Sequence, residues 1–316
     1  MFNIYDEVKG LKSIAITGHE RPDGDCIGSC LALYLYLKKR MPEADVKVFL
    51  QKTSSAFNSI PAVGDIDSSF KSDIIFDAFI VLDSVPDRTG TMEMYSKAGK
   101  TINIDHHKSN AEGSSMVNYV VAGASSTAEL IYDIIDKEFI DKDIATLIYM
   151  GIAHDTGVFR YSSTTSKTLK TVASLVEYGF DFSDLLDNTF FEKTYKQNRF
   201  QSRIVLDSKL YFDGKVIVGL ADKGLMEEFG ATKEDFEGCV ELLRITREAK
   251  VAVLIYYKNE ETSKISFRST SDDYDVSLIS QHFGGGGHVR AAGCDVKASV
   301  LDAERLAIDE LAKIMK

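Results

Sequence analysis

Short apolar runs, each followed by a polar cluster, make up much of the first half of the chain. The runs are rich in β-branched residues and predict buried strands. Between and after them lie stretches whose apolar positions repeat at helical spacing. The predicted strands are 13–19, 46–51, 79–84 and 101–107, and the predicted helices are 27–40, 125–139 and 143–154. This pattern is typical of an α/β fold with a parallel sheet between helices, in which ligands bind beyond the carboxyl ends of the strands.

The pattern changes after residue 190. Residues 191–208 are polar and aromatic and contain no Gly or Pro, so they predict a linking helix rather than a flexible tether. Two strand pairs follow, at 209–223 around the turn dipeptide Asp213-Gly214 and at 250–270. A helix at 275–283, a glycine run, a strand at 291–297 and a closing helix complete the pattern. We predict domains at 1–190 and 209–316, the second a smaller α/β domain.

Composition excludes several classes of protein. The 316 residues, 44% hydrophobic, suffice for two domains with their own cores. A formal net charge of −11 argues against a protein that coats long duplex nucleic acid, which requires a broad basic surface. The four cysteines have no disulfide-framework spacing, the N-terminus lacks a signal-peptide pattern, and no apolar run approaches the roughly 20 residues that span a bilayer. We therefore expect a reduced, cytoplasmic protein without a membrane segment.

Asp and His residues gather in four of the polar clusters. The clusters are His19 with Asp23 and Asp25, then Asp83, then Asp105-His106-His107, then His154-Asp155. Oxygen and imidazole ligands without thiolate suit Mn²⁺, Mg²⁺ or Co²⁺ better than a structural zinc ion. Carboxylates from several elements can hold two ions about 3.5–4 Å apart with one Asp between them, the geometry for displacement at phosphorus.

The first cluster has an informative spacing. In an extended segment Asp23 and Asp25 would point to the same side, so that one loop could serve both ions. Pro22 would stiffen that loop and Gly24 would permit close approach. Single clusters also have ordinary explanations: His154-Asp155 as a helix cap or salt bridge, and Asp83 as an Asx-turn. All six histidines, however, lie in these clusters or in the glycine-rich segment 282–293, which favours a functional interpretation.

The remaining motif is the segment 282–293, which contains four consecutive glycines before His288. Such a run is unfavourable in a regular element, so it is either a loose surface loop or a place where backbone approaches a ligand closely. We favour the second interpretation. Upstream, Arg268 ends a predicted strand and offers a planar donor for phosphate or carboxylate, with an ordinary surface salt bridge as the alternative.

As an ordered set, these motifs resemble the DHH phosphoesterase superfamily. The triplet is 105–107, the opening motif 19-HERPDGDCIGS-29, the strand-end acid Asp83 and a further element 155-DTGVF-159. The second half resembles the DHH-associated domain through 267-FRST-270 and 284-GGGGH-288. The resemblance covers nearly the whole chain. It implies a catalytic domain and a substrate-binding domain, with the active site in the cleft between them.

The resemblance also implies roles for individual residues. One ion would be held by His19, Asp23 and bridging Asp83, and a second by Asp25, Asp83, His106 and Asp155. His107 would face the substrate and act in catalysis with Asp83. Substrate would be bound by Arg268, Ser269, Gly284, Gly285, Gly286, Gly287 and His288. His154 departs from the family pattern, where a smaller polar residue is common, and its role is left open.

Within the superfamily, the two-domain layout is most similar to bacterial enzymes that degrade very short oligonucleotides and dephosphorylate 3′-phosphoadenosine 5′-phosphate (pAp). The expected partners are therefore nucleotides and short oligonucleotides such as pApA and pGpG, and the expected cofactor is a pair of Mn²⁺ ions, with Mg²⁺ or Co²⁺ as alternatives. A cyclic di-AMP phosphodiesterase and a non-catalytic nucleotide sensor are the alternative functions. The sequence leaves the oligomeric state open, and a homodimer is one alternative.

Overall fold

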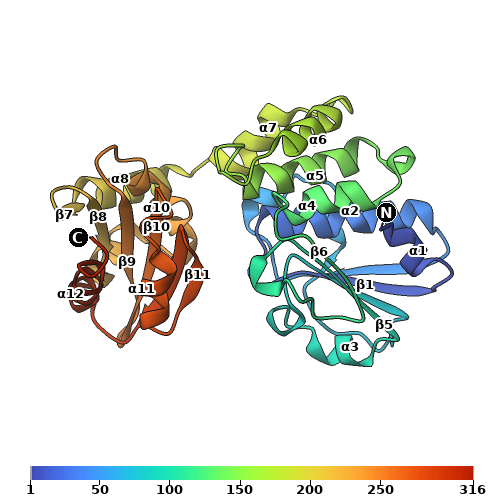
Figure 1. The fold of residues 1–316 in the computed structure, drawn as a ribbon, viewed down its shortest axis with the longest axis horizontal. Coiled ribbons are helices and arrows are strands. Elements are labelled where there is room, and N and C mark those ends of the chain that lie inside the picture. The colour runs from blue at the N-terminus through green and yellow to red at the C-terminus, as the bar shows by residue number, and fades with distance from the viewer. Residues whose placement is uncertain (1, 316) are drawn as a thin grey trace. The chain divides into compact units, whose positions relative to one another are not determined.

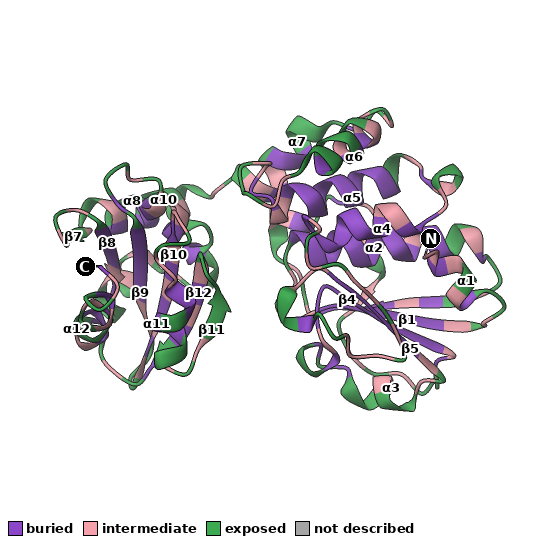
Figure 2. Ribbon diagram, viewed as in Figure 1, coloured by how far each residue is buried: buried purple, intermediate pink, exposed green. Residues whose placement is uncertain are grey.

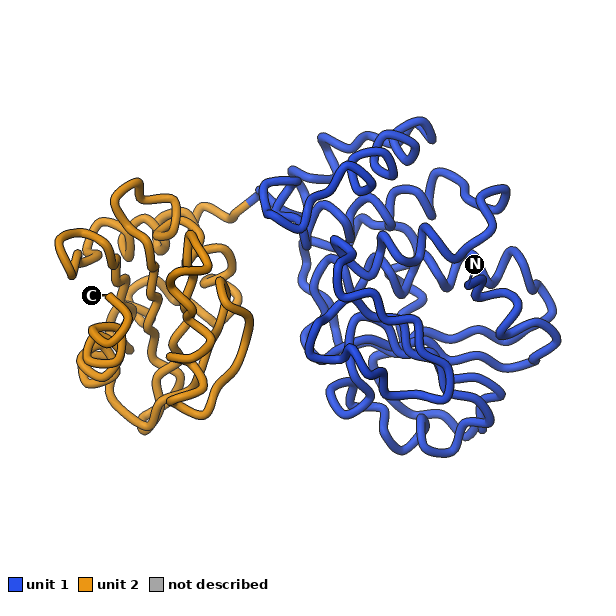
Figure 3. The backbone as a smooth tube through the Cα atoms, in the orientation of Figure 1, with its two compact units in different colours: residues 1–192 blue, residues 193–316 orange. Residues whose placement is uncertain are grey.

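The structure is a computed structural model and describes residues 2–315 (Figure 1). The chain folds into two compact units, Met1–Glu192 and Lys193–Lys316 (Figure 3). Each unit has its own six-stranded sheet and its own hydrophobic core. The predicted α/β fold class is confirmed, with a parallel sheet in the first unit and a smaller sheet domain after it.

Six parallel strands form the sheet of unit 1 in the order β3-β2-β1-β4-β5-β6. The strands are β1 (Ser13–Thr17), β2 (Asp45–Phe49), β3 (Ile66–Asp67), β4 (Ala78–Leu82), β5 (Lys100–Asp105) and β6 (Val117–Val120). The central strands are buried (Figure 2), which explains why their sequences are continuous apolar runs. Strands β2 and β3 are added on one side of β1, and β4, β5 and β6 are added on its other side. The strand order therefore reverses between β1 and β4, and ligands of such sheets bind beyond the carboxyl ends at this point.

Helices cover both faces of this sheet (Figure 1). The larger layer includes α2 and α5, which pack closely because Gly28 and Gly151 lie where they meet. A Cβ atom on Gly28 would lie 2.5 Å from the carbonyl oxygen of Leu147. The α-helices of unit 1 are α1 (Ile4–Val8), α2 (Gly24–Arg40), α3 (Met92–Lys97), α4 (Thr127–Ile134), α5 (Lys142–Asp155), α6 (Ser166–Val176) and α7 (Phe182–Leu186). A π-helical turn, η6 (Asp187–Phe191), follows α7, and short 3₁₀ turns are η1 (Ser55–Phe57), η2 (Val63–Asp65), η3 (Pro86–Arg88), η4 (Lys108–Asn110) and η5 (Lys137–Phe139).

The sheet of unit 2 is mixed, in the order β11-β12-β10-β9-β8-β7, with β8 and β9 parallel and the other pairs antiparallel. Its strands are β7 (Lys209–Tyr211), β8 (Val216–Ala221), β9 (Val251–Asn259), β10 (Thr262–Ser269), β11 (Gly286–His288) and β12 (Ala291–Val296). Apolar side chains of α8 and α10 pack on one face, and those of α11 and α12 on the other. The helices are α8 (Tyr195–Leu206), α9 (Lys223–Phe229), α10 (Cys239–Arg244), α11 (Val276–His282) and α12 (Val300–Leu311), with the 3₁₀ turn η7 (Lys233–Phe236).

The predicted elements differ from the structure in several details. The sequence pattern missed the edge strands β3, β6 and β11 and the helices α1, α3, α6, α7, α9 and α10. The helix expected at 191–208 is α8, which belongs to unit 2 because Phe200 and Ile204 are buried in that unit's core. Among residues 2–315, no helix combines the length and the apolar character that a membrane span requires.

Candidate metal centre

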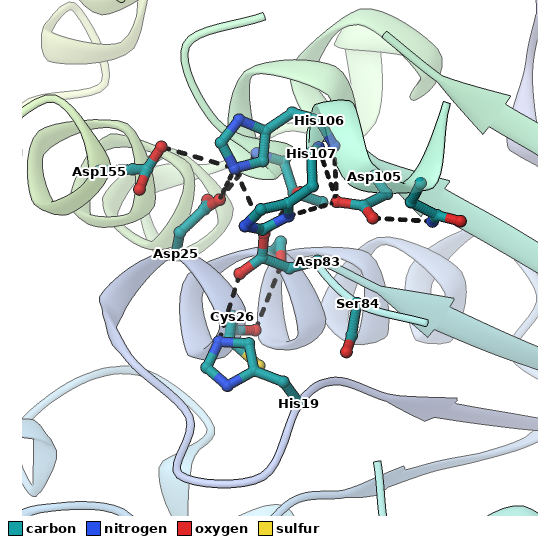
Figure 4. Close-up of polar contacts among 12 residues, drawn as sticks. His19, Asp25, Cys26, Asp83, Ser84, Asp105, His106, His107 and Asp155 are labelled. Carbon is teal, nitrogen blue, oxygen red and sulfur yellow. Dashed lines mark hydrogen bonds and ion pairs between the residues drawn. The ribbon is translucent and has the colours of Figure 1, made fainter. Parts of the chain in front are cut away.

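Acidic and imidazole side chains meet at the carboxyl edge of the unit 1 sheet (Figure 4). His19 follows β1, Asp83 follows β4, and His106 and His107 follow β5. The N-terminus of α2 supplies Asp23 and Asp25, and the last residue of α5 is Asp155. The sequence-predicted metal ligands are thus brought together at the switch point between β1 and β4.

Asp83 occupies the centre of this cluster. Its side chain is 3% exposed, and its two oxygens face different histidines. Oδ2 lies 3.5 Å from Nε2 of His19, and Oδ1 lies 3.5 Å from Nε2 of His106. Oδ1 also accepts a hydrogen bond of 3.0 Å from the hydroxyl of Thr127. A carboxylate with one oxygen turned toward each of two imidazoles has the arrangement of a bridging ligand.

His106 faces a second group of carboxylates on the other side of Asp83. Its Nε2 atom lies 3.5 Å from Oδ2 of Asp155 and 3.9 Å from Oδ2 of Asp25. The opposite ring nitrogen, Nδ1, is 3.4 Å from the carbonyl oxygen of Ala124. This contact favours a proton on Nδ1 in the neutral ring, so that Nε2 is the nitrogen that could bind a metal ion among the carboxylates.

Asp23 and Asp25 are held differently from the prediction. The segment is not extended: Asp23 caps α2 by accepting from the amides of Asp25 and Cys26, both at 3.1 Å, and Asp25 lies in the first helical turn. The buried carboxylate of Asp25 accepts from the amides of Thr127 and Ala128 at 2.7 and 2.8 Å. These amides begin α4, whose N-terminus favours a negative charge. The directions of the two acids are therefore set by the start of a helix and not by an extended segment, in which both would point to the same side.

Asp105, the first residue of the DHH triplet, serves as a support. Its Oδ1 atom accepts from the amides of His106 and His107, at 2.7 and 3.1 Å, and contacts Nδ1 of His107 at 2.7 Å. Oδ2 accepts from the side-chain amide of Asn110 at 2.8 Å. The hydrogen bond that the ring of His107 donates to Asp105 raises the pKa of His107 despite burial of the ring. Asp105 therefore orients His107 and favours its protonated form.

His154 directly precedes Asp155 but belongs to none of the candidate ligand groups found among residues 2–315. Its ring packs between Phe57 and Phe190, at centroid distances of 5.5 and 5.2 Å, and Nε2 lies 3.2 Å from the hydroxyl of Thr189. Gly24 makes room for it, since a Cβ atom there would lie 2.2 Å from Cγ of His154. His154 thus supports the turn between Asp23 and Asp25 by packing.

The electrostatics of the cluster fit divalent cations. Burial and the nearby charges of Asp83 and Asp155 raise the pKa of Asp25 well above its usual value, and burial is the main reason that the pKa of Asp155 rises to about 6. For His106, burial opposes the charged ring, but Asp83, Asp25 and Asp155 outweigh it and raise the pKa to about 10. A field that holds a proton so firmly on imidazole would also attract a metal ion.

Among residues 2–315, candidate ligand atoms form three overlapping groups, in each of which the atoms lie within 4.8 Å of one another. The groups are His19 with Cys26 and Asp83, Asp83 with His106 and His107, and Asp25 with His106 and Asp155. The structure adds Thr127 and Cys26 to the residues inferred from sequence. Thr127 lies more than 40 residues from its partner Asp83, so no local spacing could have indicated it.

In unit 2, the predicted substrate-binding residues converge on one end of β12. Arg268 on β10 and His288 on β11 both pair with Ala291, so the three residues form one row across the sheet. The amide of Ser269 donates to the carbonyl of Arg290 at 2.9 Å. Arg268 also donates to Glu241 at 2.8 Å, so the salt bridge considered as an alternative is present.

The glycine run is more regular than predicted, and part of it has a structural reason. A Cβ atom on Gly285 would lie 2.4 Å from the carbonyl oxygen of Gly293, and one on Gly287 would lie 2.4 Å from that of Ala291. The amides of Gly284 and Gly285 already donate to carbonyl groups at the end of α11. These two amides are therefore occupied, contrary to the expectation that all four would face substrate. Open space surrounds the Cβ positions of Gly284 and Gly286.

Carboxylate and imidazole donors gathered at the carboxyl edge of a parallel sheet are the arrangement expected of a metal-dependent hydrolase. Residues 13–152 match the family described as DHH family, N-terminal domain, and residues 213–316 match the DHHA1 domain. The chain belongs to the DHH family, whose members are metal-dependent phosphoesterases.

Several known proteins are similar over most of the chain. The bifunctional oligoribonuclease and PAP phosphatase NrnA of Thermus thermophilus is 31% identical over 292 residues, 92% of this chain and 86% of that protein. The protein of the same name from Bacillus subtilis is 28% identical, over 94% of this chain and 93% of its own length. The crystal structure of an exopolyphosphatase-related protein from Bacteroides fragilis has a TM-score of 0.91 at 24% identity, covering 99% of this chain and 95% of that one. This last similarity concerns the fold alone.

Proposed function

We propose that the protein hydrolyses very short oligonucleotides, including linear dinucleotides, and also removes a phosphate from pAp, using two divalent metal ions. The observation that carries this proposal is the position of Asp83, whose two oxygens each lie 3.5 Å from a different imidazole. Two ions sharing one carboxylate are suited to displacement at phosphorus. The similarity to oligoribonuclease and PAP phosphatase proteins supports the substrate class.

The ligands divide between two positions. One ion would be held by His19, Asp23 and Asp83. The other would be held by Asp25, Asp83, His106 and Asp155. All of these ligands offer nitrogen or oxygen atoms. Such donors suit Mn²⁺, with Mg²⁺ or Co²⁺ as alternatives. When bound, the two ions would supply a nucleophile by lowering the pKa of water and would neutralise charge on the phosphoryl group.

The chain's own side chains would position and protonate the substrate. His107 would donate a hydrogen bond from Nε2 to an oxygen of the scissile phosphate, because its Nδ1 atom is already bonded to Asp105. The amides of Thr127 and Ala128 would keep the carboxylate of Asp25 in a fixed orientation. In unit 2, Arg268 and His288 would bind a second phosphate or the terminal nucleotide, together with Ser269, Gly286 and Gly287.

A Mn²⁺-dependent hydrolysis panel tests the proposal. Purified protein is incubated with pApA, pGpG, a five-nucleotide RNA, pAp, cyclic di-AMP and pyrophosphate, and products are separated by chromatography. We expect rapid turnover of the linear dinucleotides and of pAp. Consumption of cyclic di-AMP alone would instead favour a signalling phosphodiesterase, and binding of nucleotide without any hydrolysis would favour a sensor.

The Asp83→Asn variant tests the bridging role within the same panel. Loss of the shared charge should reduce turnover by at least about a hundredfold and weaken metal binding. Asp87→Asn is the matched control, because Asp87 lies four residues away in η3 and is exposed. Full activity of Asp83→Asn with a normal metal content would contradict the bridging assignment.

A further inference from the structure

Cys26 places a thiol on the His19 side of the candidate metal centre. It lies in the first turn of α2, between Asp25 and the apolar part of the helix, and it is 0% exposed. Its Sγ atom, a ring nitrogen of His19 and a carboxylate oxygen of Asp83 all lie within 4.8 Å of one another (Figure 4). Gly18 provides the space, since a Cβ atom there would lie 2.2 Å from the Cys26 sulfur.

His19 presents its lone pair to the same place. Nδ1 of the ring lies 2.8 Å from the carbonyl oxygen of Glu20, which favours a proton on Nδ1. Nε2 then faces Oδ2 of Asp83 at 3.5 Å and Oδ1 of Asp23 at 3.7 Å. In a tetrahedral zinc site with Zn–S near 2.3 Å and Zn–N near 2.0 Å, neighbouring ligand atoms are about 3.5 Å apart. The distances from His19 to Asp83 and Asp23 are therefore compatible with a small tetrahedral ion, and the Cys26 sulfur lies within 4.8 Å of the same nitrogen and of the Asp83 oxygen.

We propose that Cys26 is a fourth protein ligand at the position defined by His19, Asp23 and Asp83, and that it makes this position selective for a thiophilic ion such as Zn²⁺ over Mn²⁺. This inference rests on the proposed two-ion function and concerns its metal selectivity. Ligation breaks the S–H bond of Cys26, forms a metal–sulfur bond and releases one proton to solvent.

The fourth ligand has a consequence for chemistry. The ring of His19, the carboxylates of Asp23 and Asp83 and the thiolate of Cys26 would supply the four protein donors of a closed structural zinc site, which has no open position for water. A six-coordinate ion such as Mn²⁺ prefers oxygen and nitrogen donors and keeps positions for water and phosphate beside His19, Asp23 and Asp83. Zn²⁺ at this position is therefore expected to inhibit hydrolysis that Mn²⁺ supports.

The alternative role for Cys26 is packing, because a buried free cysteine behaves as a small apolar side chain. Cys30 provides the matched control. It lies one helical turn further along α2, is also fully buried, and belongs to none of the candidate ligand groups found among residues 2–315. Cys26→Ser and Cys30→Ser are therefore equal in chemistry and in burial but differ in their relation to His19 and Asp83.

Cobalt substitution gives a readout that needs no substrate. The metal-free full-length protein is titrated with Co²⁺ while the near-ultraviolet thiolate-to-cobalt charge-transfer band is recorded. Wild type and Cys30→Ser should develop the band, and Cys26→Ser should lack it. Competition with a chromophoric chelator should show Zn²⁺ affinity reduced at least about tenfold in Cys26→Ser, with a smaller change for Mn²⁺. Cobalt binding without a band in wild type, or a band that survives in Cys26→Ser, would overturn the proposal.

X-ray absorption of the zinc-loaded wild type keeps the test independent of any variant's folding. With zinc at both positions, one sulfur neighbour at about 2.3 Å is expected for every two zinc ions, and a shell of nitrogen and oxygen alone would reject Cys26 as a ligand. Neither spectroscopic result depends on hydrolysis. A charge-transfer band in a protein that hydrolyses none of the nucleotides would support Cys26 as a ligand and contradict the proposed function. Hydrolysis without the band would support the proposed function and contradict Cys26 as a ligand.

Discussion

Acid should destabilise the metal-free protein through His154, and replacing this residue with Gln should remove that part of the pH dependence. Burial between Phe57 and Phe190 lowers the pKa of His154 to about 4, from an ordinary value of 6.5. The hydroxyl of Thr189 donates to the carbonyl of Leu185, so the ring must donate its Nε2 proton to Thr189. Gln at this position can make the same donation without titrating.

The sign and size follow from proton linkage. Because the folded pKa is the lower one, the unfolded chain binds more protons between pH 6.5 and 4, so the free energy of unfolding falls as pH falls through this window. The contribution of His154 is fully present above pH 6.5. For pKa values of 6.5 and about 4, the loss between pH 7 and pH 4.5 is about 2 kcal/mol.

Urea unfolding at pH 7 and at pH 4.5, followed by circular dichroism in the presence of a chelator, measures this loss. For each protein, the unfolding free energy at pH 4.5 is subtracted from that at pH 7. The loss obtained for wild type is then compared with the loss obtained for His154→Gln. Other titrating groups are present in both proteins, so their contributions largely cancel in this difference. Wild type should lose about 2 kcal/mol more than His154→Gln. Equal losses in the two proteins would refute the assignment of a neutral, buried imidazole.

Three further predictions concern the surroundings of the site. Gly24→Ala should lower the free energy of unfolding, measured in thermal melts, by about 1–3 kcal/mol, because the new Cβ would lie 2.2 Å from the ring of His154. The control Gly64→Ala should be nearly neutral, because no atom lies within 4 Å of its Cβ position. Thr127→Val removes the 3.0 Å hydrogen bond to Asp83 and should reduce Mn²⁺ affinity or kcat/KM about tenfold; an unchanged titration would remove Thr127 from the support of the site. His288→Ala should raise KM for dinucleotides with little change in kcat, and unchanged kinetics would separate this residue from substrate binding.

Strand ends and their chemistry are largely readable from the sequence of unit 1. Buried parallel strands need continuous apolar runs, so polar residues that follow such runs mark the carboxyl edge of the sheet. Asp83 and His106 illustrate this, since each lies at the polar end of a predicted strand and directly follows the strand in the structure. The strands β3 and β6 escaped prediction because they are short edge strands with little buried surface, which leaves them without a long apolar run.

Contacts between distant segments could not be read in the same way. The carboxylate of Asp25 is held by the amides that begin α4, about 100 residues later, and no spacing rule reports such a contact. The same limit applies to Cys26, whose closeness to His19 depends on how α2 packs over the end of β1. Gly285 and Gly287 show a different limit, because glycine required by a neighbouring strand looks identical in sequence to glycine required by a ligand.

Topology explains why Asp83, rather than another acid, takes the central position. In the strand order of unit 1, β4 lies between β1 and β5, so the residue after β4 is flanked by the residues that follow those two strands. His19 and His106 arrive from either side, and Asp83 adopts a left-handed backbone conformation with φ of 57° immediately after the strand. Asp and Asn tolerate this conformation better than most residues. Asp83→Asn can therefore keep the backbone turn while removing the charge, which makes it a test of ligation rather than of folding.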